Sequence, residues 1–583
     1  MAAQDSETSR SLVRQAEIAL EQAQLTDPAG RASLLLDAAI LFAQGGDIAQ
    51  SRQTLKLIST TNLSDTFFVE YSLLGLELDL VSFKLDSARE WLGQPRFVTV
   101  RSALGINFQR RILRLESALN AARGDAIASI DNHIQLAALF NSRKIGDQKL
   151  IAAVHDKIWQ QLNELPFQQL QRTELGDTGV LAGWFELAAS MRYRQASPAA
   201  QKSLFEVWQK RWRDHPAATI PPSVLKNRSR DNPPKSIALL LPLQQEYEIP
   251  SSTVLDGFMS GYYENLAQGR AVPSVAIYDT SSRPVSDVYN QAIDLGAEMV
   301  IGPLRQSQVE ELVSAPELRV PTLTLNRLDT QLANSPDNLV QFGLSALDEV
   351  NQLADQAWLQ GHSNVLIISP DSGWGERAQR HFVDYWNAKG GVVIDAITYP
   401  SSINDFTRLL QRPLEIDLSE QRGLALRRSV NRSLSYTPRR RQDIDLVIVL
   451  GYSEKVRQIK PALDFLYAAD VPVYATSHIY SGTQQIELNR DLSGIKFSAM
   501  SWTLDGHMPR PINPDQRLPT AYRQLYALGY DAFLLHALLG ELNNPQAVPV
   551  FGATGLLTLR DGVIERREKW ATFENGRVIA TQP

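Results

Sequence analysis

The stretch from Lys235 to Pro303 contains three short apolar runs, SIALLLP (236–242), SVAIYD (274–279) and MVIGP (299–303). Between them lie 252–265 and 286–295, in which apolar residues recur at helical spacing. Strands that alternate with helices in this way indicate βαβ units and a parallel sheet with helices on both faces. In such a sheet, ligands bind beyond the carboxyl ends of the strands.

The alternation continues to residue 477 and falls into two series. The first series ends with expected strands at 320–325 and 339–344, and a second begins with an expected helix at 347–360. The second series continues with strands at 364–370, 391–397, 445–451 and 471–477 and a helix at 375–388. Two successive parallel sheets predict two lobes with a cleft between them.

Composition and charge exclude several kinds of protein. The 583 residues can form several cores, because 44% of them are hydrophobic. The formal net charge of -6 disfavours a nucleic-acid partner, which requires a basic field. The count of zero cysteines excludes disulfides, thiolate metal sites, thiol catalysis and a lipid attached to a cysteine of this chain. We find neither an apolar run of about 18 residues nor a signal-peptide pattern at the start, so the chain as given is expected neither to span a membrane nor to export itself.

The first part of the chain, residues 1–215, is predicted to consist of helical repeats. Its apolar residues recur at helical spacing, with almost no alternating strand pattern. Asp47, Asp86 and Asp125 lie in similar local sequences at a constant spacing of 39 residues (86 minus 47 and 125 minus 86). An aspartate at a helix start accepts unpaired amide hydrogens, so we expect each of the three to cap a helix.

These repeats resemble tetratricopeptide-like helical arrays, although the usual period of those is about 34 residues. Stacked helical hairpins form extended concave surfaces that bind proteins or peptides. The alternative is a spacer that only packs on the rest of the chain. A proline-rich segment at 216–234 follows, and we expect it to be an extended linker before a two-lobed domain at 235–583.

The end of the chain carries a specific pattern. Gly552 and Gly555 precede an apolar strand, Asp561-Gly562 predicts a tight hairpin turn, and Trp570 and Phe573 follow. This pattern resembles the closing hairpin of type I periplasmic binding proteins, over about residues 235–583. The resemblance implies two lobes that close around a small ligand.

The order of a helical-repeat region, a proline-rich segment and this two-lobed domain resembles a narrower family, the penicillin-binding protein activators of Gram-negative outer membranes. Further likeness lies in 237–243, Asp256-Gly257-Phe258, Tyr278-Asp279-Thr280 and 301–304. Members are lipoproteins anchored in the outer membrane through a lipidated cysteine, and they stimulate a bifunctional class A peptidoglycan synthase in the periplasm. The resemblance implies a non-catalytic activator of transpeptidation, whose chain as given starts after the signal peptide and anchor cysteine. The alternative function is a periplasmic receptor for an amino-acid-like solute.

Polar and aromatic residues follow several of the expected strands and are candidates for lining the cleft. They are Arg305, Gln306, Ser307, Thr324, Asn326, Ser372, Trp374, Tyr452, Ser453 and Ser477. This mixture could hold an anionic or amino-acid-like ligand. The competing interpretation, which we favour from sequence, is that these residues bridge two lobes that no longer open, because a fold alone does not carry a function.

An unusually basic insertion lies between Phe406 and Asp445. It has nine arginines and only four acidic residues, Glu415, Asp417, Glu420 and Asp443. The plain interpretation is a solvated, mobile loop. The functional hypothesis is docking on an acidic patch of a partner or on an anionic envelope polymer. The docking candidates are Arg427, Arg428, Arg432, Arg439, Arg440 and Arg441.

No pattern typical of an enzyme is present. The eight histidines are scattered, and we find no H-E-x-x-H, G-x-S-x-G, Walker loop or G-x-G-x-x-G. Ser223 and Lys226 form an S-x-x-K, but no K-T-G accompanies it, so coincidence is the better interpretation. We therefore expect no catalytic residues, no metal and no cofactor.

Overall fold

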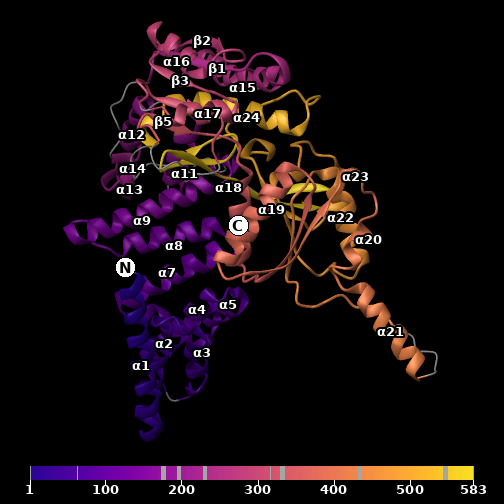
Figure 1. Ribbon diagram of the computed structural model, residues 1–583. Helices are drawn as coiled ribbons and strands as arrows, with labels where there is room; N and C mark the ends of the chain where they lie inside the picture. The colour runs from indigo at the N-terminus through magenta and orange to yellow at the C-terminus, as the bar shows by residue number, and fades with distance from the viewer. Residues whose placement is uncertain are drawn as a thin grey trace. The chain divides into compact units, whose positions relative to one another are not determined.

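The computed structural model describes residues 2–61, 63–171, 179–193, 198–226, 233–315, 317–328, 335–430, 436–542 and 549–581. The chain divides into two compact units, Met1–Gln161 and Leu162–Pro583 (Figure 1). This division falls earlier than the expected change at residue 215, and the expected domain boundaries stay predictions.

The first unit is helical throughout its described residues, as predicted. Its elements are α1 (Ala2–Leu25), α2 (Pro28–Gln44), α3 (Ile48–Lys56), α4 (Asp65–Val81), α5 (Leu85–Gly93), α6 (Pro95–Val100), the 3₁₀ turn η1 (Arg101–Ala103), α7 (Ile106–Ala122), α8 (Ala126–Ala138) and α9 (Ile145–Glu164), which runs past the boundary. Apolar side chains from α1 to α5 form one buried cluster, and those from α4 to α7 form the next.

Three helix ends in this unit share one turn geometry. Gly46, Phe83 and Gly124 have positive φ angles of 87°, 52° and 83°. The amide of each following residue donates to the carbonyl five residues earlier, over 2.8–2.9 Å. This bond and the left-handed residue before it define a Schellman turn at the helix C-terminus. The same turn therefore ends α2, α4 and α7.

The structural repeat begins at the residue after each turn, at positions 47, 84 and 125. Its spacings are 37 (84 minus 47) and 41 (125 minus 84), so the constant spacing of 39 is not the structural period. Asp47 and Asp125 cap α3 and α8 as predicted. The predicted cap at Asp86 is wrong, because Lys84 is the N-cap residue and Asp86 lies inside the first turn of α5.

Small side chains allow the paired helices of each repeat to approach. Ser51, Ala88 and Ser129 each lie four residues after the start of a repeat, and all three are fully buried. The hydroxyl of Ser51 donates to the carbonyl of Ala39 over 2.6 Å, and that of Ser129 to the carbonyl of Ser117 over 2.9 Å. Each buried hydroxyl is thus satisfied across the helix pair.

The second unit begins with short helices: α10 (Phe167–Gln171), α11 (Val180–Tyr193), α12 (Pro198–Arg211), α13 (Pro216–Thr219) and α14 (Ser223–Lys226). The last two lie in the segment expected to be extended. That expectation is wrong for residues 216–219 and 223–226. In α13, Pro216 stands at the first helical position, where its missing N–H costs nothing. His215 caps α13, and its ring packs against Trp184, Trp208 and Trp212.

The first sheet forms the lobe that we call lobe A. Its strands are β1 (Ser236–Leu241), β2 (Ser274–Asp279), β3 (Met299–Ile301), β4 (Thr322–Thr324), β5 (Leu339–Gln341), β11 (Val550–Phe551), β12 (Leu556–Arg560) and β13 (Val563–Arg567), in the order β11-β12-β13-β5-β4-β3-β1-β2. The strands from β13 to β2 pair in parallel, as predicted, while β11 and β12 are antiparallel additions.

Alternating residues of β1 are buried on the two faces of this sheet. Ile237 and Leu239 pack in a cluster with α15 (Glu248–Ala267) and α24 (Thr520–His536). Ala238 and Leu240 pack in a cluster with α16 (Val285–Asp294) and α17 (Gln306–Val313). Helices thus cover both faces, as a buried parallel strand requires. The remaining helical pieces are η2 (Gln245–Tyr247) and α25 (Leu539–Leu542).

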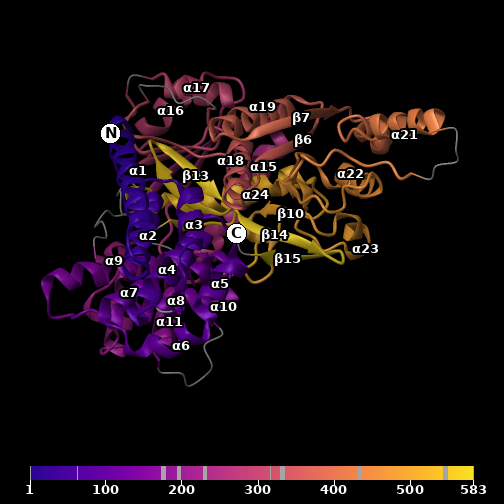
Figure 2. The ribbon, with the colours of Figure 1, turned by 90° about the horizontal axis from the view of Figure 1, so that it is seen from below.

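The second sheet forms lobe B. Its strands are β6 (Asn364–Pro370), β7 (Val392–Tyr399), β8 (Leu446–Val449), β9 (Val473–Ala475), β10 (Lys496–Ala499), β14 (Lys569–Glu574) and β15 (Arg577–Thr581), in the order β15-β14-β10-β9-β8-β6-β7. Its helical elements are α18 (Ala346–Leu359), α19 (Gly373–Ala388), α20 (Phe406–Gln411), α21 (Ile416–Val430), α22 (Ser453–Phe465), η3 (Ser477–Ile479), α23 (Ile486–Asn489), η4 (Arg490–Leu492) and η5 (Ser501–Thr503). Figure 2 shows β10, β14 and β15 side by side.

The chain passes between the lobes three times. The first crossing leads from β5 to α18, the second from β10 to α24, and the third from β13 to β14. In the third crossing a single residue, Glu568, separates the last residue of β13 from the first residue of β14. Residues that are distant in sequence therefore meet where the lobes join. The predicted hairpin at Asp561-Gly562 is confirmed, since β12 and β13 pair antiparallel around it.

Candidate functional site

A pocket of about 380 Å³ lies between the two lobes. Lobe A contributes the start of α17, the segment after β4 and the first two turns of α24. Lobe B contributes the start of α18, the first two turns of α19 and His478 of η3. A pocket of this volume at the meeting point of two lobes is of the size that holds a small molecule.

Three of the ten predicted cleft residues line this pocket: Gln306, Asn326 and Trp374. Gln306 is the first residue of α17, and Trp374 lies in the first turn of α19. Asn326 follows β4, and its side-chain amide donates to the carbonyl of Leu304 over 3.0 Å. All three lie just beyond strand ends, as the argument from sheet topology predicts.

Three other predicted residues of lobe A lie beside the pocket. The guanidinium of Arg305 lies 4.5 Å from the ring centroid of Tyr247, and Ser307 is exposed on α17. Thr324 is fully buried, and its hydroxyl donates to the carbonyl of Asn326. Thr324 therefore shapes the loop that presents Asn326.

The remaining four predicted residues belong to lobe B. Ser372 caps α19 by accepting the amide hydrogen of Gly375 over 3.1 Å. Tyr452 and Ser453 lie at the start of α22. Ser477 is buried, and its amide donates to the carboxylate of Glu349 over 2.9 Å. These side chains position the local structure around the pocket and do not line it.

Several residues that line the pocket were not predicted from the sequence, because they do not directly follow a strand. Glu349 lies in the first turn of α18, Arg377 in the second turn of α19, and Gln524 in α24, which follows the second crossing. Arg327 directly follows the predicted Asn326, and His478 follows the predicted Ser477. Extending each candidate position by one residue would have found the last two.

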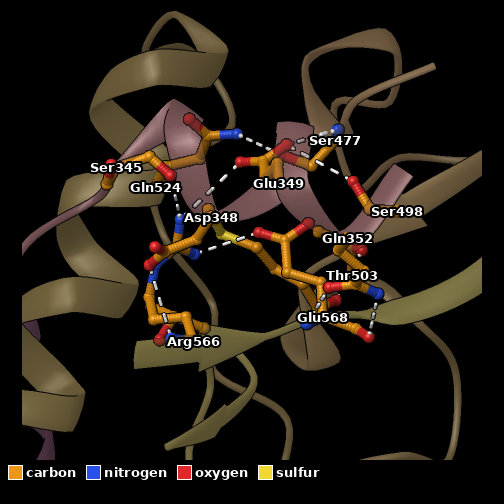
Figure 3. A network of polar contacts seen from close by, with 12 residues as sticks. Ser345, Asp348, Glu349, Gln352, Ser477, Ser498, Thr503, Gln524, Arg566 and Glu568 are labelled. Atoms are coloured by element: carbon orange, nitrogen blue, oxygen red, sulfur yellow. Dashed lines mark hydrogen bonds and ion pairs between the residues drawn. The ribbon is translucent and has the colours of Figure 1, made fainter. Parts of the chain in front are cut away.

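A buried network of charged side chains lies at the three crossings (Figure 3). Arg566 of β13 pairs with Glu568 of the third crossing over 3.0 Å and lies 3.6 Å from Glu349 of α18, and all three side chains are at most 3% exposed. Asp348 pairs with Arg327 over 2.7 Å. The side-chain amide of Gln352 bonds in both directions with the backbone of Glu568. The network therefore joins α18 of lobe B to β13 of lobe A.

Burial perturbs the acid–base properties of this network. Burial, and then the negative charge of Glu349, raise the pKa of Glu568 well above its ordinary value, although Arg566 opposes the shift. Burial lowers the pKa of Arg566, but the surrounding carboxylates outweigh it, so that this pKa is raised. The rise for Glu568 is mainly an effect of burial, whereas the rise for Arg566 reflects the carboxylates around it.

Three rings stand beside the network in lobe B. The ring centroid of His478 lies 4.5 Å from that of Trp374 and 5.5 Å from that of Tyr452. The Nδ1 atom of His478 is buried without a hydrogen-bond partner, and it lies 3.9 Å from the carboxylate of Glu349. Burial lowers the pKa of His478, so its imidazole is neutral at pH 7. The pocket wall thus presents a neutral ring with an unsatisfied nitrogen.

The basic insertion contains helix α21, which projects away from the sheet of lobe B in both views (Figures 1 and 2). Arg427, Arg428 and Arg439 are exposed. Arg440 is buried and bonds to the carbonyl of Tyr467 and the carboxylate of Asp470. Arg440 therefore forms bonds within the protein and does not offer its guanidinium to a partner.

Arg441 is also held by the protein, since it forms two hydrogen bonds with the carboxylate of Asp443. Arg432 lies outside the described residues. Five of the six docking candidates thus lie in the described residues. Three of them are exposed, and the other two, Arg440 and Arg441, form bonds within the protein.

The described residues contain no group of three His, Cys, Asp or Glu side chains that could hold a metal ion. Within the same part of the chain, none of the helices combines the length and apolar character that crossing a membrane requires.

Comparison with known proteins gives a family match along most of the chain. The sequence profile of the family described as "LppC putative lipoprotein" matches residues 10–576. The penicillin-binding protein activator LpoA of Edwardsiella ictaluri is 26% identical, with 86% of this chain and 85% of the relative covered. LpoA of Glaesserella parasuis is 24% identical, with 91% and 86% covered.

Two solved structures are also similar to this chain. Full-length LpoA from Haemophilus influenzae is 20% identical, with 97% of this chain and 98% of that chain covered and a TM-score of 0.46. The C-domain of the same protein, described as a regulator of PBP1A, is 22% identical, with 59% of this chain and 99% of that chain covered and a TM-score of 0.44.

Proposed function

This chain belongs to the LppC family of lipoproteins, and from that premise we propose that it is a non-catalytic regulator of peptidoglycan synthesis. It binds a bifunctional class A penicillin-binding protein and stimulates its transpeptidase activity. It does so at the periplasmic side of the outer membrane, to which a lipid anchors it. The observation that carries the proposal is the coverage: the match to residues 10–576 includes nearly all of both compact units, and relatives named as activators align over most of their length.

The proposed mechanism is a shift between conformations of the synthase. A binding protein accelerates an enzyme only if it binds the active conformation more tightly than the inactive one. A tenfold rise in transpeptidation requires a difference of about 1.4 kcal/mol between these two binding free energies. Such a difference is within the range of one docking surface, so no catalytic group of this chain has to take part.

The test is peptide cross-linking by the purified synthase, measured with and without this protein. We expect the rate to rise with concentration and to saturate when the synthase is fully bound. Binding has to be measured in parallel, for example by surface plasmon resonance. Saturating binding with an unchanged cross-linking rate would contradict the proposal.

We propose further that helix α21 and residues 436–439, which we call the basic finger, dock on an acidic groove of the synthase. From Gln421 to Arg439 the sequence has five arginines and no acidic residue, in a chain of net charge -6. Leu424 and Leu426 are 43% and 57% exposed on the same helix.

The arginines of α21 point in different directions around the helix. Arg422, Arg427 and Arg428 are separated by five residues and one residue, which places them on different faces at about 100° per residue. A helix that lies on a flat membrane surface needs one apolar face. A finger that is basic around its whole circumference is better suited to a concave partner.

Charge reversal of the exposed arginines tests this docking. We expect the triple variant Arg427→Glu, Arg428→Glu, Arg439→Glu to weaken binding to the synthase by about tenfold or more at low salt, and less at high salt, where charges are screened. The control is Arg490→Glu with Arg560→Glu, which reverses arginines that are 63% and 71% exposed elsewhere in the second unit. Equal binding by the two variants would show that the basic finger does not dock.

A further inference from the structure

Two exposed aromatic residues, Phe465 and Tyr467, lie at the end of helix α22 in lobe B, and we call them the aromatic pair. Phe465 is 72% exposed, more than any other described aromatic side chain, and Tyr467 is 48% exposed. Leu466 and Ala468, which alternate with them, are buried in the core of lobe B. A single exposed apolar side chain is ordinary, but two aromatic ones this close together form a patch.

The backbone of Tyr467 has a conformation that glycine usually provides. Its φ angle is 62°, and the amide of Ala468 donates to the carbonyl of Leu463, five residues earlier, over 2.9 Å. In this Schellman turn the residue with a positive φ angle is most often glycine, because a Cβ atom is unfavourable there. The ring of Tyr467 does not belong to the core cluster of lobe B, so packing does not explain a tyrosine here. Strained residues of this kind cluster at functional sites.

The aromatic pair lies next to the base of the basic finger. Arg440, which directly follows the finger, donates to the carbonyl of Tyr467 over 3.0 Å and to the carboxylate of Asp470 over 2.7 Å. These two segments precede β8 and β9, which are parallel neighbours. They therefore lie where the strands of lobe B begin, at the opposite edge from the strand ends that face the pocket.

The carboxylates beside the aromatic pair are already paired within the protein. Asp470 pairs with Arg440, and Asp464 forms an ion pair with Lys460. The last residue of the basic finger, Arg439, is exposed. The surface thus has an aromatic centre beside a basic region. Protein interfaces combine a central aromatic anchor with a polar rim in the same way.

We propose that the aromatic pair is the apolar anchor with which this chain docks on the synthase, at an apolar pocket bordered by the carboxylates that receive the basic finger. The inference rests on the proposed function and names the residues that hold the complex once opposite charges have brought the two proteins together. Charges at the rim of an interface mainly raise the association rate, whereas a buried anchor mainly lowers the dissociation rate. The two parts of the surface therefore have different kinetic signatures.

The variants Phe465→Ala and Tyr467→Gly test the proposal by surface plasmon resonance on the immobilised synthase. We expect each to weaken binding by about tenfold through faster dissociation. The loss should be the same at low and at high salt, because salt screens charges and not apolar contacts. The triple variant of the basic finger should instead slow association, and its loss should shrink at high salt.

Tyr467→Gly also separates docking from folding. Glycine accepts a positive φ angle, so this variant should unfold at the same temperature as the wild type or at a higher one. The matched control is Phe83→Gly, because Phe83 occupies the same turn position in the first unit with a φ angle of 52°. A second control is Leu295→Ala, which removes a side chain that is 70% exposed in lobe A. Both controls should bind the synthase as the wild type does.

The outcomes that overturn the proposal are distinct. If the wild type binds the synthase and both variants bind equally well, the aromatic pair is not the anchor, although the proposed function stands. Equal losses in the variants and in the controls would also overturn the proposal. A wild type that does not bind the synthase would remove the proposed function together with this inference. Binding to vesicles of anionic phospholipid that is lost in Phe465→Ala would assign the aromatic pair to a membrane instead.

Discussion

At the scale of single residues, Asp531 of α24 accounts for Gly552 near the end of the chain. Its fully buried carboxylate accepts the amide hydrogens of Ala553 and Thr554 over 2.6 and 2.8 Å, and the hydroxyl of Thr554 over 2.6 Å. A Cβ atom at Gly552 would lie 2.6 Å from this carboxylate, and Gly555 has a φ angle of 149°. Burial raises the pKa of Asp531 to about 6, although these bonds oppose the shift. This segment is thus a structural loop built around one acid.

His507 gives a prediction about pH. It is 4% exposed, and burial, with further lowering by the charges of Lys569 and Arg192, brings its pKa from 6.5 to about 4. The unfolded chain therefore binds a proton between pH 6.5 and 4 that the folded chain does not bind. The stabilising effect of the neutral ring is fully present above about pH 6.5 and is lost as the pH falls through 4.

We expect His507→Gln to reduce this acid sensitivity. The thermal unfolding midpoint of the wild type should fall more between pH 7 and pH 4.5 than that of the variant. Lys569 does not contribute to this comparison. Burial lowers its pKa from 10.5 to about 7, so its effect on stability falls between pH 7 and pH 10.5, above the range compared here. Identical pH profiles of the two proteins would contradict the assigned burial of His507.

The sequence predicted part of the site because strand ends are visible in a sequence. Gln306, Asn326 and Trp374 follow strands and line the pocket. Glu349 and Gln524 lie in helices, and their role depends on partners far along the chain: Glu349 accepts from Ser477, 128 residues away. Such pairs follow from the three crossings, which local patterns do not reveal.

At the scale of elements, the contact between α15 and α24 depends on two glycines. A Cβ atom at Gly257 would lie 1.9 Å from the carbonyl oxygen of Tyr526, and one at Gly529 would lie 2.0 Å from that of Val254. The two helices therefore approach backbone to backbone. This contact explains the glycine of the Asp256-Gly257-Phe258 motif.

We expect Gly257→Ala to destabilise lobe A by roughly 1–3 kcal/mol, the usual cost of overpacking. The matched control is Gly146→Ala in α9, where an added Cβ atom has no neighbour within 4 Å. Removing that glycine should stabilise the helix by up to about 1 kcal/mol. Urea unfolding followed by circular dichroism measures both effects. Equal stability of the two variants would show that the close approach is absent.

Among the elements, the strands of the second unit were the easiest to predict, because buried parallel strands are continuous apolar runs. Strand β10 (Lys496–Ala499) was missed, since its four residues include a lysine and a serine. The crossing from β13 to β14 leaves no local pattern in the sequence, because a single residue, Glu568, separates the two strands. In the helical unit, Phe83 occupies a turn position that glycine fills in the other two repeats, and this hid the true spacing.

At the scale of the second unit, the buried network makes the joint between the lobes stiff. Each of the three crossings has a residue in or beside this network. These residues are Ser345 in the first crossing, Thr503 in the second and Glu568 in the third (Figure 3). Breaking a buried ion pair on one side leaves a charge without compensation, which costs roughly 3–5 kcal/mol. Opening the lobes would require such breaks, so we expect a narrow range of lobe separations in solution.

The variant Arg566→Met tests this expectation. It leaves Glu349 and Glu568 buried without their guanidinium partner, and we expect a loss of stability of roughly 3–5 kcal/mol together with a wider range of lobe separations. The chain has zero cysteines, so Leu295→Cys in lobe A and Phe465→Cys in lobe B, which replace side chains that are 70% and 72% exposed, accept spin labels without background. Pulsed electron paramagnetic resonance then measures the distribution of distances between the two labels.

The neighbouring residue provides the control. Arg567 lies on the same strand with a side chain that is 59% exposed, and its pair with Glu164 spans 3.8 Å, so Arg567→Met should cost less than about 1 kcal/mol. We expect its distance distribution to match that of the labelled wild type. A distribution in Arg566→Met as narrow as in Arg567→Met would show that packing, and not the charged network, fixes the lobes.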